Sequence, residues 1–194
     1  MENEVQILSG LRKFASSRGC RDLIVMAVVA EAFFVALSPV VAEIALLLGF
    51  AVYLFRWKFD SGYHYRKSPV FGAILVFMLC GGASVLVSPD RGFSFYNWYN
   101  LAVVYCMTFV LGTQNVTTKG EVKYIAYALG LSAAIVVAYG FFQYTFGIDT
   151  SEMKWVDGEA FPELRKRVFS TWENPNILAA YLDIVICVLL GLLA

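Results

Sequence analysis

The sequence predicts an all-α fold, a polytopic transmembrane helical bundle of about six spans with a cytoplasmic N-terminus. Hydrophobic residues make up 59% of the 194 residues, and the mean hydropathy is +0.66. Charged residues make up only 15%, against about 25% in an ordinary soluble domain. So few charges would not cover the surface of a soluble domain of this length. The same composition excludes disordered, collagen-like and coiled-coil chains, and four cysteines are too few for a disulfide-rich secreted scaffold.

Six apolar runs separated by charged clusters are the predicted spans. They cover residues 23–37, 40–55, 69–87, 98–113, 124–146 and 177–194. Helices are expected because lipid leaves open backbone groups unsatisfied, and the runs lack the alternation of barrel strands. Only Ser38 and Pro39 separate the first two runs, which predicts a tight helical hairpin with Pro39 in the turn or at a helix start.

The chain is expected to form a single membrane domain over residues 1–194. Residues 1–21 are polar and no small-residue cleavage site follows them, so the first span is expected to be retained rather than removed as a signal peptide. The last apolar run reaches Ala194 with no charged flank. This predicts that the chain is the N-terminal portion of a longer protein.

The basic residues predict the orientation. One side is assigned Arg12, Lys13, Arg18, Arg21, Arg56, Lys58, Arg66, Lys67, Lys119 and Lys123, and the other Arg91, Lys154, Arg165, Lys166 and Arg167. Cytoplasmic loops carry the excess of Lys and Arg, so the first and larger set is expected to be cytoplasmic. Residues 147–174 then form the longest extracytoplasmic loop.

Most familiar catalytic signatures are missing from the sequence. There is no phosphate-binding loop and no dinucleotide fingerprint. The only histidine, His64, has no second ligand at metal spacing and is expected to be a solvated loop residue. We therefore predict no metal site, no cofactor and no nucleic-acid partner.

Two acidic residues in apolar runs are candidates for a polar cleft. Ionisable groups are expensive to bury in a bilayer and often mark functional sites. Glu31 lies in the middle of the first run, where a proton-relay role and a structural hydrogen bond between helices are both open. Asp183 follows Asn176 by seven residues and so shares its helical face.

The most informative stretch runs from residue 165 to 176. Asn174 is a good helix cap and Pro175 fits the first helical position, which predicts that the sixth span starts here. Arg167 and two further basic residues lie just upstream. A helix N-terminus beside arginines favours an anion such as a lipid-linked phosphate or pyrophosphate. The alternative is a capped helix start with basic residues that are merely solvated.

The same stretch resembles a known family. The residues that carry the resemblance are Arg167-Val168-Phe169-Ser170-Thr171-Trp172-Glu173-Asn174-Pro175-Asn176, followed by Ile177-Leu178-Ala179-Ala180-Tyr181-Leu182. They look like the Arg-x-x-Gly/Ser-Thr-x-x-Asn-Pro-Asn…Ala-Ala-Tyr-Leu segment of the O-antigen ligase and O-antigen polymerase-like integral membrane proteins. The hairpin at residues 33–44 also resembles the first two helices of that family.

The resemblance implies a metal-independent glycosyltransferase that crosses the bacterial inner membrane several times. Such enzymes move a glycan from an undecaprenyl-pyrophosphate carrier to a lipid, polysaccharide or protein acceptor on the extracytoplasmic face. Arg167 would contact the pyrophosphate, while Asn174, Pro175 and Asn176 would hold the helix start. The family's histidine base and further spans would follow Ala194, so no catalytic base is identified in this chain.

Two other classes remain open from the sequence. One is an inner-membrane transporter or flippase, in which Glu31 and Asp183 would act as coupling groups. The other is a non-catalytic, truncated membrane protein.

Overall fold

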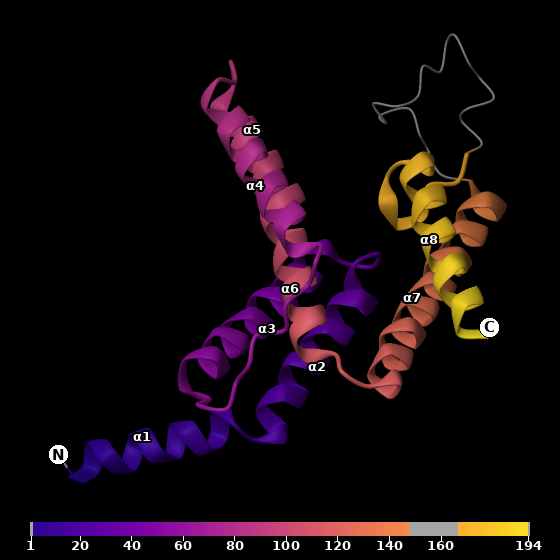
Figure 1. The fold of residues 1–194 in the computed structure, drawn as a ribbon. Helices are drawn as coiled ribbons and strands as arrows, with labels where there is room; N and C mark the ends of the chain where they lie inside the picture. Colours follow the sequence, from indigo (N-terminus) through magenta and orange to yellow (C-terminus); the bar gives the residue numbers. More distant parts are fainter. Residues whose placement is uncertain (1, 148–166, 194) are drawn as a thin grey trace. The chain divides into compact units, whose positions relative to one another are not determined.

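The structure, a computed structural model, describes residues 2–147 and 167–193, and it is helical with no strand over these ranges (Figure 1). The helices are α1 (Glu2–Ala15), α2 (Arg18–Phe34), α3 (Pro39–Phe59), α4 (Phe71–Leu86), α5 (Arg91–Trp98), the π-helix η1 (Tyr99–Val104), α6 (Tyr105–Asn115), α7 (Lys119–Phe146), the 3₁₀ turn η3 (Ser170–Trp172) and α8 (Pro175–Leu193). The all-α fold class is confirmed. The chain divides into two compact units, the first with residues 1–28 and 43–121 and the second with residues 29–42 and 122–194.

Three helices, α3, α7 and α8, are long and apolar enough to cross a membrane. A membrane core about 30 Å thick needs about 20 helical residues, and these helices have 21, 28 and 19. The other predicted spans are helical but shorter or interrupted. Helix α2 has 17 residues and α4 has 16, and the predicted span at 98–113 is divided among α5, η1 and α6.

The first unit brings α2 and α3 together at a glycine. Helix α3 begins at Pro39, as the sequence predicts. A Cβ atom added to Gly49 of α3 would lie 2.7 Å from the Cβ of Ala27 in α2 and 3.2 Å from the Cδ1 of Leu111 in α6. Only a glycine allows this approach, so Gly49 determines how closely α3 packs against α2 and α6.

Helix α4 packs against the end of α5 through a second pair of glycines. The Trp98 indole lies against Gly81 and Gly82, where added Cβ atoms would come within 3.0 and 3.3 Å of the ring. Its Nε1 atom donates a hydrogen bond to the Met78 carbonyl at 2.9 Å. Asp90 caps α5 by accepting from the Phe93 amide.

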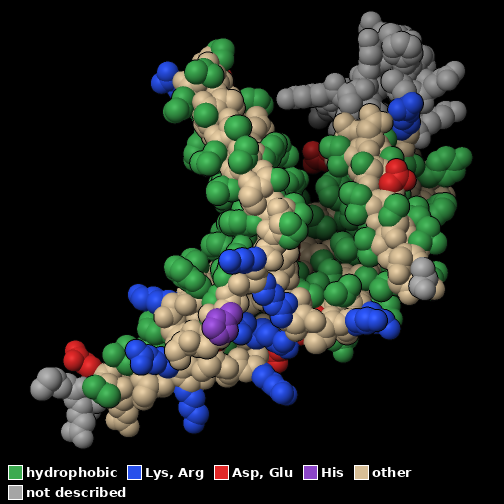
Figure 2. Space-filling model, in the orientation of Figure 1, with side chains coloured by type: hydrophobic (Ala, Val, Ile, Leu, Met, Phe, Trp, Pro, Cys, Tyr) green, Lys and Arg blue, Asp and Glu red, His purple; other side chains and the backbone are tan. Residues whose placement is uncertain are grey.

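The segments that the sequence places on the basic side lie at one end of the first unit. The loop after α3 is bound to the end of α6, because Gln114 accepts from the Arg66 amide and donates to the Arg66 carbonyl. The start of α2 is bound to the α6–α7 turn, because Arg21 donates to Thr117. Figure 2 shows Lys and Arg side chains gathered around the single histidine at this end, while hydrophobic side chains cover the helices. His64 is exposed in the loop, as expected.

Helix α1 and the early start of α7 were not predicted, although each has a local cause in the sequence. In α1, Leu8, Leu11 and Ala15 are spaced to share one helical face, and Ala15 is fully buried. Helix α7 begins with a capping box, in which the Thr118 hydroxyl accepts from the Glu121 amide and the Glu121 carboxylate accepts from the Thr118 amide.

The second unit has a small apolar core between α7 and α8. Ala133 and Val136 of α7 pack with Leu178, Tyr181 and Val185 of α8, and Ala36 joins them from the α2–α3 turn. Trp172 covers this core, with its ring 5.1 Å from that of Tyr181. The predicted motif at residues 167–176 is therefore packed directly on the α7–α8 pair.

We predict that Gly49→Ala destabilises the first unit by about 1–3 kcal/mol, because the added methyl group overpacks the contact with Ala27. The measurement is thermal unfolding of the chain in detergent. Gly112→Ala is the matched control, because its Cβ would meet no atom within 4 Å. Equal unfolding temperatures for the two variants would show that Gly49 is not a packing constraint.

Candidate functional site

The candidate site is the segment between α7 and α8 that contains Arg167. Arg167 is exposed and lies three residues before the η3 turn. Arg165 and Lys166, which the sequence analysis places beside it, fall outside the described residues. The site is therefore built from residues 167–176 and the parts of α7 and α8 that hold them.

Gln143 of α7 binds this segment at Ser170. The Gln143 Oε1 atom accepts from the Ser170 amide at 2.8 Å, and its Nε2 atom donates to the Ser170 carbonyl at 3.1 Å. Gln143 is only 5% exposed and Ser170 only 3%. One buried side chain thus satisfies both backbone groups of a residue that is outside any α-helix.

Three further contacts fix the same segment. The Ser170 hydroxyl donates to the Val136 carbonyl at 2.6 Å, and the Thr171 hydroxyl donates to the Ala36 carbonyl. Val168 lies against Gly140, where an added Cβ would come within 3.0 Å of the valine methyl group. The segment therefore lies close against α7 at a point where α7 has no side chain.

The backbone turns sharply on either side of η3. Ser170 and Glu173 have φ angles of 52° and 54°, in the left-handed region that side chains other than glycine rarely adopt. Such a conformation persists only where surrounding contacts impose it. At Ser170, those contacts are the hydrogen bonds to Gln143 and Val136.

The start of α8 is capped as the sequence predicts. The helix begins at Pro175, and the Asn174 Oδ1 atom accepts from the Asn176 amide at 2.9 Å. Pro175 has no N–H, and that of Asn176 is bound to the cap. The first two positions of α8 therefore offer no free N–H to an anion. An anion here would depend on Arg167 and on the helix dipole.

An apolar groove of about 310 Å³ borders the segment. Its walls come from α7, from Val168 and from α8, where Leu178 and Leu182 face it. Val168 directly follows Arg167, so an exposed cation lies one residue from the groove. This combination of a hydrocarbon-lined groove and an adjacent cation fits an amphiphilic anion.

The two acidic candidates lie elsewhere on their helices. Asp183 is exposed on α8, on the face that also carries Asn176 and away from the core residues Leu178 and Val185. Glu31 is half-buried on α2. A polar cleft formed by Glu31 and Asp183 stays a prediction.

Sequence reasoning missed Gln143 and Gly140, the two α7 residues that hold the segment. A lone glutamine inside an apolar run is a signal that was available in the sequence. The sequence does not indicate which residue Gln143 binds, because Ser170 lies 27 residues away.

The described part of the chain is α-helical, and its three long apolar helices indicate a membrane protein. Comparison with protein-family models, with curated proteins and with solved structures found no match for this chain. Among the described residues, no three His, Cys, Asp or Glu side chains come together as metal ligands.

We predict that Gln143→Leu lowers the stability of the second unit by about 2 kcal/mol or more, because it leaves two buried backbone groups of Ser170 unpaired. Hydrogen exchange at the Ser170 and Thr171 amides should accelerate by more than tenfold. Thr145→Val serves as the control, since among the described residues the exposed Thr145 hydroxyl binds the Phe141 carbonyl of its own helix. Unchanged exchange in the Gln143 variant would contradict this role.

Proposed function

We propose that this chain is an O-antigen ligase- or polymerase-like glycan transferase of a bacterial inner membrane. It would move a saccharide from an undecaprenyl-pyrophosphate carrier to a lipid, polysaccharide or protein acceptor on the extracytoplasmic face. The observation that carries the proposal is the exposed Arg167 next to an apolar groove, on a segment that buried hydrogen bonds hold in place.

The chemistry of such a donor matches the two halves of the site. The carrier has a long hydrocarbon chain, for which the groove between α7, Val168 and α8 offers apolar walls. Its pyrophosphate carries negative charge, for which Arg167 offers a guanidinium that can bind two oxygens at once. A soluble sugar nucleotide has no hydrocarbon chain, so the apolar groove would not contribute to its binding.

The role of Arg167 in this reaction is to stabilise the leaving group. Breaking the bond between the sugar and the pyrophosphate increases negative charge on the phosphate oxygens. A fixed cation stabilises that charge most in the transition state, when it develops. The hydrogen bonds at Ser170 and the cap at Asn174 hold the chain between Arg167 and the start of α8. The acceptor hydroxyl must also lose a proton, and this chain offers no assigned base.

The proposed topology has six crossings with the N-terminus in the cytoplasm. In addition to α3, α7 and α8, it embeds α2, α4 and the helical run from α5 to α6. The hydrogen bonds of Arg21 to Thr117 and of Gln114 to Arg66 support it, because they join segments that the charge pattern assigns to one side. Those segments carry the larger share of the basic residues.

We predict that Arg167→Ala lowers glycan transfer by about 100-fold or more, the usual effect of removing one transition-state contact. The assay is transfer from a lipid-linked donor in membranes that contain the variant. Arg91→Ala is the control, because Arg91 is also exposed and assigned to the same side. Wild-type product from the Arg167 variant would overturn the assignment of the site.

The topology predicts opposite labelling of two loops. Ser61 and Pro89 are both exposed, in the α3–α4 and α4–α5 loops. With a membrane-impermeant maleimide, Pro89→Cys should react in intact cells, and Ser61→Cys only after the membrane is opened. The unsubstituted chain gives the background from its four cysteines. The reverse pattern would invert the orientation and place Arg167 on the cytoplasmic side.

A further inference from the structure

A polar cleft of about 520 Å³ lies in the first unit, where α1 ends and α2 begins. Three arginines line it, namely Arg18, Arg21 and Arg56, and Asp22 is its one carboxylate. The hydroxyl groups of Ser16, Ser17 and Thr118 complete the lining. The proposed transferase site uses none of these residues.

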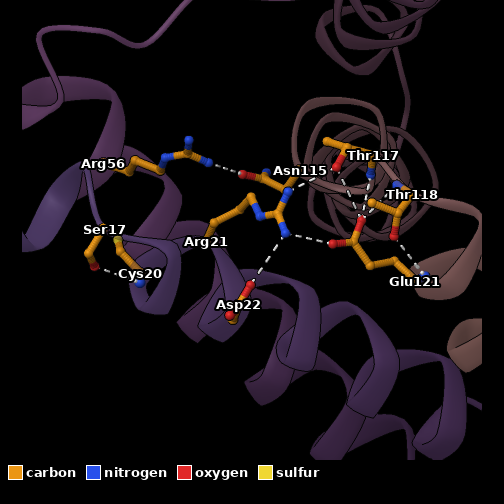
Figure 3. Close-up of polar contacts among 9 residues, drawn as sticks. All are labelled: Ser17, Cys20, Arg21, Asp22, Arg56, Asn115, Thr117, Thr118 and Glu121. Atoms are coloured by element: carbon orange, nitrogen blue, oxygen red, sulfur yellow. Dashed lines mark hydrogen bonds and ion pairs between the residues drawn. The ribbon is translucent and has the colours of Figure 1, made fainter.

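Arg21 is fixed from two sides (Figure 3). Its Nη1 atom donates to the Thr117 hydroxyl at 2.9 Å and its Nη2 atom donates to Glu121 at 2.8 Å. Glu121 is itself held by the amides of Thr117 and Thr118, at 2.7 and 2.9 Å. The guanidinium of Arg21 is therefore preorganised at the wall of the cleft.

Arg56 is fixed in a similar way from α3. Its Nη1 atom donates to the Oδ1 atom of Asn115, which is fully buried, and its Nε atom lies 3.5 Å from an oxygen of Asp60. The Nε atoms of Arg21 and Arg56 are buried, and neither makes a hydrogen bond to the described residues. These buried Nε atoms cannot reach a ligand in the cleft. Each guanidinium has five N–H donors, however, and the contacts above leave Nη donors of both groups unused.

Arg18 differs from the other two arginines. It is exposed at the first position of α2 and makes no ion pair or hydrogen bond with the described part of the chain. The hydroxyl of Ser17 accepts from the Cys20 amide and so caps α2 just before it. The charge of Arg18 is therefore available to a ligand in the cleft, because its guanidinium holds no other described residue in place.

The lining alone is net positive, with three arginines against Asp22. Glu121 and Asp60 pair with Arg21 and Arg56 from outside it, and Asp22 lies 3.5 Å from Arg21. Among the described residues, Arg18 is the arginine of the lining that has no carboxylate partner. The cleft thus joins arginines from two helices, which favours an anion with several oxygens.

We propose that this cleft binds a phosphate group, carried either by an anionic phospholipid or by a free phosphate anion. Arginine pairs bind phosphate oxygens in a bidentate manner, and a shared cleft lets one phosphate contact Arg18 together with Arg21 or Arg56. The Thr118 hydroxyl lines the cleft but is engaged with Glu121, whose amide donates to it, so the arginines are the groups that would bind the phosphate oxygens.

Helix α1 favours the lipid as the source of the phosphate. Its apolar side chains Ile7 and Leu8 are 62% and 46% exposed, and Phe14 contacts Phe55 of α3. An amphipathic helix with an exposed apolar face lies in the interfacial layer of a membrane. The cleft begins at Ser16, one residue beyond α1, and so would lie at the level of the headgroups.

The first arm of the test measures lipid preference. The chain is placed in phosphatidylcholine vesicles, and electron spin resonance compares binding of spin-labelled phosphatidylglycerol with that of spin-labelled phosphatidylcholine. We expect Arg18→Gln to lower the preference for the anionic lipid by about fivefold. Arg12→Gln, which removes the same charge from exposed α1 outside the cleft, should change it by less than twofold.

The second arm titrates inorganic pyrophosphate into the same phosphatidylcholine vesicles by calorimetry. Saturable binding that Arg18→Gln weakens and Arg12→Gln leaves intact supports a free anion as the source. Loss of lipid preference alone supports the headgroup. Equal effects of the two variants in both arms, or no binding in either arm, would overturn the proposal. The thermal unfolding of each variant shows that it is folded.

Discussion

Two buried glutamines in this protein each form hydrogen bonds to both backbone groups of one distant residue. Gln114 binds both the amide and the carbonyl of Arg66, with both hydrogen bonds 2.9 Å long, and Gln143 binds both groups of Ser170. Gln114 lies near the end of the short helix α6 and Gln143 near the end of the long apolar helix α7, and each is 5% exposed. A chain segment that leaves the helical state beside such helices needs partners for its backbone, because neither lipid nor apolar side chains supply them. The glutamines meet this requirement in each unit separately.

The geometry of the candidate transferase site depends on the hydrogen bonds of Gln143. The left-handed turn at Ser170 brings the chain from the face of α7 to the start of α8, and Arg167 lies at the beginning of that turn. Without the Gln143 contacts, the turn would have a strained residue and two unpaired backbone groups. The apolar groove also depends on this contact, because Val168 forms part of its wall. The position of the cation and of the groove therefore depends on Gln143, together with the contacts that Val168, Ser170 and Thr171 make.

The first unit concentrates its polar chemistry at one end. The hydrogen bonds of Gln114 to Arg66 join the loop after α3 to α6, and the Arg21–Glu121 ion pair joins α2 to the start of α7. Both contacts bring basic segments together despite the repulsion among their charges, and carboxylates and amides stabilise the arrangement. The cleft around Arg18 is a consequence of this packing. The two units thus differ in their electrostatic character, with arginines clustered in the first and the exposed Arg167 beside a groove in the described part of the second.

The sequence alone determined the features that depend on composition and on neighbouring residues. These include the membrane class, the all-α fold, the helix start at Pro39 and the Asn174 cap before Pro175. The capping box of Thr118 and Glu121 was readable in the same way, because its partners are three residues apart. Each of these signals is local, so its physical cause lies within a few residues.

Only the tertiary structure decided which residues form the sites. The partners of Gln143, Gln114 and Arg21 lie 27, 48 and 100 residues away, and no local pattern specifies such pairs. The ends of α2 and α4 and the π-helix within the run 91–115 were not predicted, and neither were close contacts between distant residues such as Gly49 with Ala27 and Trp98 with Gly81. An uninterrupted apolar run predicts that a segment is helical and buried in lipid. It does not predict where neighbouring helices interrupt or shorten it, because that depends on the shape of the surfaces they present.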